Sequence, residues 1–368
     1  KYVKEGNAEK VMEIVDKKRF TISLGSVLRI LNECKSEEIK KIMNNIINDA
    51  KDLYEYLFPN ADEREEWEVI IERLNNMLNL QSSKKLKEQY GDCRFYVSVM
   101  VDKGKVIAYS QFTTLPLDED KLIVYWEYAG IADKDFMNKK YKSKENYFRD
   151  PMIIKQGYDY VLWIASENAK KMNRRGGVAG IIMEAEMIGQ VPPLEKGQKP
   201  NKEDIVFTKL RLQIHNFYGG MRIVMIEKND GTLINPHIQP SLGAGKKPIQ
   251  LHLLYRPMFL EPGQSKKREE IDAQLAKKLI TAYLDYLGSE ESVHESAEEV
   301  RRIVNERFKV AARVVLIPPD EIPNIIELAK NDPLLKQQID EHYGKYLKGT
   351  GIKLMEIFAD IIKSAFMK

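Results

Sequence analysis

The spacing of apolar residues changes at Cys93, and this change constrains the fold more than any other feature of the sequence. Before Cys93, apolar residues recur three and four positions apart, which is typical of the buried face of a helix. After it, residues 95–101 and 105–115 are rich in β-branched and aromatic side chains, which indicates strands. The two patterns together predict a domain that combines helices with a sheet.

The helical pattern extends from the N-terminus to residue 79. Ser36 and the two glutamates after it are typical of a helix start, because acidic side chains stabilise a first helical turn. The Phe58-Pro59 step predicts a break, since the residue before a proline avoids helical geometry. We expect residues 1–50 to form an N-terminal helical segment, and the helices of residues 51–79 to lead into the sheet.

The central part alternates between strand and helix patterns. Asp102, Lys103 and Gly104 predict a hairpin turn between the first two strands. The later elements are expected as a strand at 121–131, a helix at 157–175, a strand at 178–186, a helix at 205–218, and strands at 221–227 and 249–257. This order favours an α+β (α/β) domain over residues 51–262, with helices on both faces of a mixed sheet.

From Ser265 onward the pattern is helical, so residues 265–368 are expected to form a C-terminal helical domain. Its apolar stripes could pack on the central domain or on another subunit, which would make a homo-oligomer. Nothing in these helices identifies a substrate.

The composition excludes several classes of protein. With 58 basic and 55 acidic residues the charges nearly cancel, so we expect neither a nucleic-acid nor a membrane partner. No apolar run approaches the roughly 18 residues that cross a bilayer. Cys34 and Cys93 stand alone, which favours a reduced, cytoplasmic protein without a metal site.

Three segments carry motifs whose order and spacing are informative. They are LYEYLFPNADEREEWE at 53–68, the strand GVAGIIMEAE at 177–186 with the later NFYGGMRIV at 216–224, and INPHIQPSL followed by IQLHLLYRP. Together they resemble one branch of the GNAT superfamily of N-acetyltransferases over about residues 50–262. The resemblance implies a sheet that splays open beside the strand 121–131, with an acyl-CoA, such as acetyl-CoA, in the gap.

The resemblance also implies which residues would hold the acyl-CoA. Its pantetheine arm would pair with the edge of the splayed strand. Its pyrophosphate would lie in a loop before the helix at 157–175, on backbone N–H groups at the helix start. Asn216 could bond the pantetheine arm. The implied contact residues are, in full, Tyr128, Ala129, Gly130, Ile131, Ala132, Lys155, Gln156, Gly157, Tyr158 and Asn216.

Acyl transfer to an amine needs a base for the amine proton and an acid for the departing thiolate. Glu127 lies on the strand expected to splay and is the leading base, with Glu184 on the next strand as an alternate. Tyr218 matches the helix tyrosine of the family and is the acid candidate. A core aromatic and a solvated or ion-paired glutamate are the structural alternatives for these residues. The acceptor would be a small-molecule or peptide amine.

Two hypotheses follow. One is an active N-acyltransferase that needs no metal. The other is a GNAT-like fold that has lost acyl-CoA binding and serves as a binding or regulatory module. The second is favoured by the expected phosphate loop, where Ile154 and Asp159 replace residues of the family pattern and only Gly157 is kept. The stretch 174–179 fits that pattern by letter, but we interpret it as a basic helix end with a glycine cap.

Overall fold

The computed structural model describes residues 7–59, 64–147, 150–185, 212, 215–227, 233–241, 248, 251–258, 269–290 and 292–319. The chain divides into two compact units, residues 1–178 and 179–368, and each is described by itself. Neither predicted boundary, near 50 or near 262, coincides with this division. The strand pairings within each unit are antiparallel, so the fold class is α+β, as expected.

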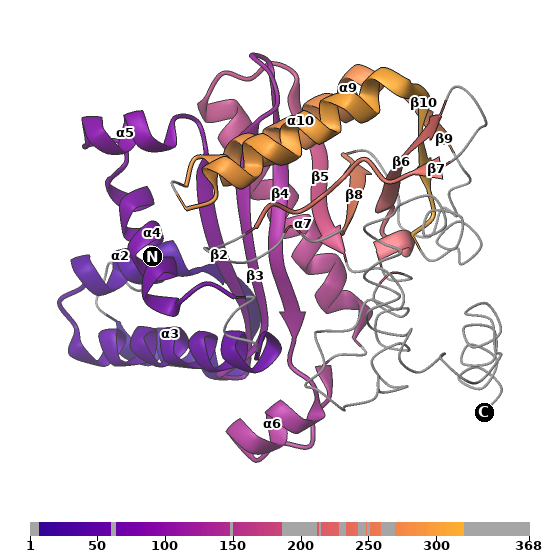
Figure 1. Cartoon of the computed structure of the whole chain (residues 1–368). Helices are drawn as coiled ribbons and strands as arrows, with labels where there is room; N and C mark the ends of the chain where they lie inside the picture. The colour runs from indigo at the N-terminus through magenta and orange to yellow at the C-terminus, as the bar shows by residue number, and fades with distance from the viewer. Residues whose placement is uncertain are drawn as a thin grey trace, which may run out of the picture. The chain divides into compact units, whose positions relative to one another are not determined.

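The first unit contains four strands and seven helices in the part of the chain that the structure describes (Figure 1). They are α1 (Ala8–Lys17), β1 (Arg19–Ser23), α2 (Leu24–Glu33), α3 (Glu37–Leu57), α4 (Trp67–Asn79), α5 (Lys84–Tyr90), β2 (Arg94–Asp102), β3 (Lys105–Pro116), β4 (Lys121–Ile131), α6 (Lys134–Tyr141) and α7 (Pro151–Lys171). The strands lie in the order β1-β2-β3-β4.

The predicted hairpin between β2 and β3 is confirmed. Asp102 pairs with Lys105, and the two residues between them have positive φ, 50° at Lys103 and 74° at Gly104. Such angles suit the tight turn whose twist matches the flanking strands. The predicted start and end of α3 are confirmed as well. Ser36 caps the helix by accepting from the Ile39 N–H at 3.4 Å, and the helix ends at Leu57, before Phe58-Pro59.

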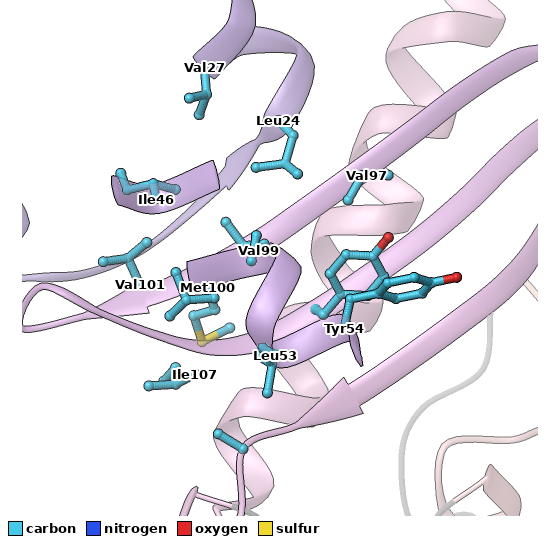
Figure 2. Close-up of a cluster of buried hydrophobic side chains, with 14 of the residues drawn as sticks. Leu24, Val27, Ile46, Leu53, Tyr54, Val97, Val99, Met100, Val101 and Ile107 are labelled. Atoms are coloured by element: carbon cyan, nitrogen blue, oxygen red, sulfur yellow. The ribbon is translucent and has the colours of Figure 1, made fainter. Parts of the chain in front are cut away.

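Residues 1–50 do not form a segment of their own. The predicted boundary at residue 50 falls inside α3, and β1, which the sequence did not predict, pairs along β2. Figure 2 shows side chains of α2, α3 and β2 pointing toward one another, with Leu24, Leu53 and Val99 buried in one core. Burial of these apolar stripes stabilises the N-terminal helices, which would be marginal alone.

The helix α7 lies on the other face of this sheet. It packs Tyr158 against Trp126 of β4, and its Asn168 bonds to Tyr96 of β2 at 2.9 Å. The helix was predicted to begin at residue 157 but begins at Pro151. The reason is local, since proline suits a first helical position and Asp150 caps the Met152 N–H at 3.0 Å. Helices therefore cover both faces of the sheet in this unit.

The second unit contains six strands and two long helices in its described residues. They are β5 (Gly177–Ala185), which begins at the junction of the units, β6 (Met221–Glu227), β7 (Leu233–Ile234), β8 (His252–Pro257), β9 (Glu269–Ile271), α9 (Ala273–Gly288), α10 (His294–Val310) and β10 (Ala311–Ile317). The strand order is β5-β8-β6-β10-β9, with β7 on β6. β5 begins at Gly177, so 174–179 does not open a helix as a phosphate loop would. The expected basic helix end with a glycine cap is wrong, because α7 already ends at Lys171 with Met172 as its C-cap.

The prediction of an almost wholly helical segment after Ser265 is wrong. β9 and β10 are strands, and β10 pairs with β6 from Ala311 to Ile317, with a register shift after Ala311. A short apolar run such as 314–317 fits a buried strand or a helix equally well, and long-range pairing decides between them. The strands β9 and β10 thus belong to the same sheet as β6. The helix expected at 205–218 lies mostly outside the described residues, and residues 320–368 lie outside them altogether.

No helix in the described ranges is both long and apolar enough to cross a lipid bilayer.

Candidate active site

The strand β4 carries an irregularity at Glu127. Trp126 pairs with Phe112 and Tyr128 pairs with Gln111, so two residues of β4 advance the register by only one residue of β3. Glu127 is the extra residue of a β-bulge. A bulge bends its strand, increases the local twist and re-aims side chains, and such features are over-represented near active sites.

The bulge changes which face of the sheet the side chains occupy. Trp126 lies against Tyr158 of α7, with ring centroids 4.7 Å apart. Tyr128 lies against Tyr54 and Phe58 of the α3 region, at 5.8 and 4.9 Å. Regular alternation would place positions 126 and 128 on the same face. The extra residue instead brings Glu127 and Tyr128 together on the α3 side.

Two side chains of β3 hold the Glu127 carboxylate. The Thr113 hydroxyl donates to one oxygen at 2.5 Å, and the Gln111 Nε2 donates to the other at 2.9 Å. Gln111 is fully buried and accepts from the Tyr109 hydroxyl at 2.8 Å. Tyr109, Gln111 and Thr113 occupy every second position of β3, so their side chains lie on the same face of the sheet, the one toward α3.

A second carboxylate, that of Glu65, approaches the same amide. The Gln111 Nε2 also donates to Glu65 at 2.7 Å, so one amide group links both carboxylates. Arg73 of α4 bonds to Glu65 at 2.5 Å. The Glu65 backbone is held by the Tyr54 hydroxyl, which accepts from its N–H at 3.0 Å and donates to its carbonyl at 3.2 Å.

The surroundings of Glu127 favour its protonated form. Burial, and then the negative charge of Glu65, raise its pKa to about 7, while Arg73, Thr113 and Gln111 act in the opposite direction. Burial is the larger cause because it penalises the charged carboxylate. A carboxyl group with a pKa near 7 can take up or release a proton at neutral pH, which an ordinary glutamate does poorly. We call Glu65, Arg73, Gln111, Thr113 and Glu127 the β4 carboxylate site.

The sequence predicted Glu127 but missed the rest of this site. Gln111 and Thr113 stand two residues apart in β3, and both are buried. Polar residues repeating on a buried face were the available signal, because each needs a partner there. Glu65 and Arg73 had no comparable signal, since they reach the site only through the packing of the α4 region on the sheet.

The five residues expected along the pantetheine arm occupy the end of β4 and the position after it. Tyr128 to Ile131 pair with β3, and the Ala132 N–H donates to the Ile107 carbonyl at 2.8 Å. At Gly130 a Cβ atom would lie 2.5 Å from Leu57, so α3 packs closely on this strand. The expected opening beside β4 stays a prediction, as does binding by Tyr128, Ala129, Gly130, Ile131 and Ala132.

The expected phosphate loop is wrong. Lys155, Gln156, Gly157 and Tyr158 lie inside α7, past its first turn, where backbone N–H groups bond to carbonyls one turn earlier. Lys155 also pairs with Asp159 at 2.5 Å, and the Tyr158 side chain is buried. These four residues therefore do not fit a backbone cradle for pyrophosphate.

In the second unit Glu184 belongs to a different polar cluster. Its carboxylate bonds to His237 Nε2 at 2.7 Å and accepts from the Tyr283 hydroxyl at 2.8 Å and from Gln239 at 3.1 Å. Its side chain is 9% exposed, and that of His237 is fully buried. Tyr283 and His237 also pack ring against ring at 4.9 Å. These hydrogen bonds connect β5 to α9 within the second unit. The placement of Glu184 thus fits a residue that stabilises the fold.

Tyr218 and Asn216 lie at the end of a helical turn, as predicted. The turn stops at Gly219, whose φ is 85°, and the Gly220 N–H donates to the His215 carbonyl at 2.8 Å. Tyr218 is 5% exposed, and its carbonyl accepts from Arg256 Nε at 2.6 Å. A buried aromatic at a helix end fits this placement, and the acid role of Tyr218 and the binding role of Asn216 stay predictions.

Within the described parts of the chain, no group of three or more His, Cys, Asp or Glu side chains is arranged to hold a metal ion. A scan against protein-family models finds none that matches the chain, and a search of curated proteins finds no match.

Proposed function

We propose that the chain is an N-acyltransferase that moves an acyl group from acyl-CoA to an amine, with Glu127 as the base. The observation that supports this most is the β4 carboxylate site, where a glutamate with a pKa of about 7 lies at a bulge. An amine attacks an acyl group only after it has lost its proton. A base with a pKa near the working pH serves that step best, because enough of it is ionised and it still binds the proton firmly.

Glu127 suits this role better than Glu184. Three donors surround the Glu184 carboxylate, and its side chain is nearly enclosed. Glu127 lies at the bulge of β4, and its raised pKa of about 7 suits it to exchange a proton at neutral pH. In the proposal Tyr218 gives a proton to the departing thiolate, and the pantetheine arm runs along Tyr128 to Ala132.

The acceptor in this proposal is an amine of a small molecule or peptide. Thr113 and Gln111 hold the Glu127 carboxylate from the β3 side, which limits its rotation. A fixed carboxylate presents its oxygen in one direction, and positioning of this kind lowers the barrier to proton transfer. Acetyl-CoA is the simplest acyl donor to test.

The test is release of free CoA thiol from acetyl-CoA in the presence of a panel of amines, with the full chain and with Glu127→Gln. We expect the variant to bind acetyl-CoA like the wild type, and we expect its turnover rate to be lower by a factor of about 100 or more. Glu167→Gln, an exposed glutamate on α7 that pairs with Lys170, is the matched control and should keep its full rate. Equal rates for wild type and Glu127→Gln would remove Glu127 from the role of base.

One observation favours the alternative, a binding or regulatory module without acyl transfer. The four residues expected in the phosphate loop lie inside α7, and the helix begins at an acidic cap, Asp150. Calorimetric titration with acetyl-CoA separates the two functions. Absence of heat and of thermal stabilisation at millimolar acetyl-CoA would support the module and contradict the enzyme.

A further inference from the structure

The first unit has a sheet edge at β1. This strand pairs with β2 over its whole length, from Arg19 opposite Asp102 to Ser23 opposite Ser98. Among the described strands it pairs with no other, so its second edge offers backbone N–H and C=O groups. Such an edge is a template for an added strand unless it is covered or charged. β1 has one charged residue, Arg19, and no proline.

A groove of about 380 Å³ is lined by β1 and α7 together. The α7 residues in its wall are Gln156, Asp159, Tyr160 and Trp163. They occupy positions i, i+3, i+4 and i+7, so they share one face of the helix. At the helical rise this face is about 10 Å long, which matches about three residues of extended chain. The length of this face therefore suits a short extended segment lying beside β1.

The groove ends in exposed aromatic surface. Trp163 is 57% exposed, and its ring lies 5.8 Å from that of Tyr160. A single exposed tryptophan is not unusual by itself. Beside a groove and an unpaired strand edge, however, it is the type of rigid aromatic anchor on which interfaces depend.

The charges of the groove favour a basic occupant. Arg19 bonds to Asp150 at 2.8 Å and to Asp102 at 3.2 Å, so two carboxylates face this one cation. Asp159 pairs with Lys155, but this pair is well exposed and contributes little, so Asp159 can change partner. Arg19 and Asp159 are the two charged residues that line the groove, and the charge of Arg19 is offset by Asp102 and Asp150. The ring faces of Trp163 and Tyr160 attract cations as well.

We propose that this groove binds an extended basic peptide segment, which adds a strand to the free edge of β1 and places a lysine or arginine side chain between Trp163 and Asp159. Main-chain hydrogen bonds to β1 would supply affinity that depends little on the peptide's sequence. Trp163 and Asp159 would select a peptide with a positively charged side chain. The site lies apart from the β4 carboxylate site in its residues, and the proposal does not depend on acyl transfer.

The test uses the full chain and a fluorescein-labelled peptide, Gly-Val-Lys-Val-Arg-Val-Gly, followed by fluorescence anisotropy. Two peptide controls separate the two contributions. One carries glutamates in place of the basic residues, and the other carries N-methyl groups on alternate backbone nitrogens. We expect the first control not to bind and the second to bind at least tenfold more weakly, because it cannot complete a strand pairing.

Variants of the protein locate the site. Trp163→Ala should weaken binding of the basic peptide at least tenfold, and Asp159→Asn several-fold. Met152→Ala and Glu167→Gln, exposed positions of α7 outside the groove, are matched controls and should bind like the wild type. Hydrogen exchange of the Arg19–Ser23 amides should slow when the peptide is added.

Absence of binding at millimolar peptide would overturn the proposal. So would equal binding by wild type, Trp163→Ala and Asp159→Asn, or equal binding of the acidic peptide. A single-stranded oligonucleotide that binds in a Trp163-dependent way, while the peptide does not, would assign the groove to nucleic acid instead.

Discussion

Glu65 and Glu127 share one hydrogen-bond donor, the side-chain amide of Gln111, which lies 2.7 Å from the first carboxylate and 2.9 Å from the second. Two carboxylates held this close disfavour each other's charge. Burial and the negative charge of Glu65 together outweigh the opposing charge of Arg73, so Glu127 favours its protonated form. This relationship underlies the first three predictions.

Replacing Glu65 should make Glu127 a weaker base. In Glu65→Gln the negative charge next to Glu127 is removed, so the pKa of Glu127 should fall from about 7 toward the ordinary value of a glutamate. It should stay above that value, because burial remains. Carboxyl-carbon NMR of the labelled glutamates measures it directly and does not depend on any activity. An unchanged titration in Glu65→Gln, with Glu88→Gln as the exposed control, would contradict the coupling.

Stability should depend on pH through Glu127. Its pKa is about 7 in the folded protein against an ordinary 4.5, so between these values the folded protein holds a proton that the unfolded chain has released. Protonated Glu127 therefore contributes fully to stability below the pKa that it has in the unfolded chain. This contribution is lost as the pH rises through the pKa that Glu127 has in the folded protein. From pH 5 to pH 8, the free energy of unfolding of the wild type should fall by about 2 kcal/mol relative to Glu127→Gln. Urea unfolding at several pH values measures this, and parallel curves would be the contrary result.

Gln111 should be important for folding as well as for the site. In Gln111→Leu, both carboxylates and the Tyr109 hydroxyl lose a partner within a buried region. Leaving buried polar groups unpaired costs about 1–3 kcal/mol. We expect a loss of that size in chemical denaturation. Gln89→Leu, at an exposed position of α5, is the control and should change stability little.

Gly157→Ala should stabilise the protein. Gly157 lies within α7, and a Cβ atom there would meet Trp126 at 3.9 Å, an ordinary contact. Alanine inside a helix is favoured over glycine by roughly 0.5–1 kcal/mol. Thermal unfolding should show a higher midpoint. A lower midpoint would mean that this position needs glycine, as a phosphate loop would.

The sequence alone determined the features that depend on residues a few positions apart. The alternation in 95–115, the turn at Lys103-Gly104 and the cap at Ser36 each act through local backbone geometry, and all three appear where they were predicted. Glu127 was selected differently, from the resemblance that made 121–131 the strand beside the acyl-CoA.

Only the tertiary structure decided the features that depend on distant partners. β1 and β10 are strands because β2 and β6 offer them an edge, and their own residues fit other structures equally well. The bulge at Glu127 arises from its register against β3, and Glu65 reaches Gln111 only because the α4 region packs on that sheet. A short segment has too little information to specify such pairings, since their free energy comes from contacts made across the whole unit.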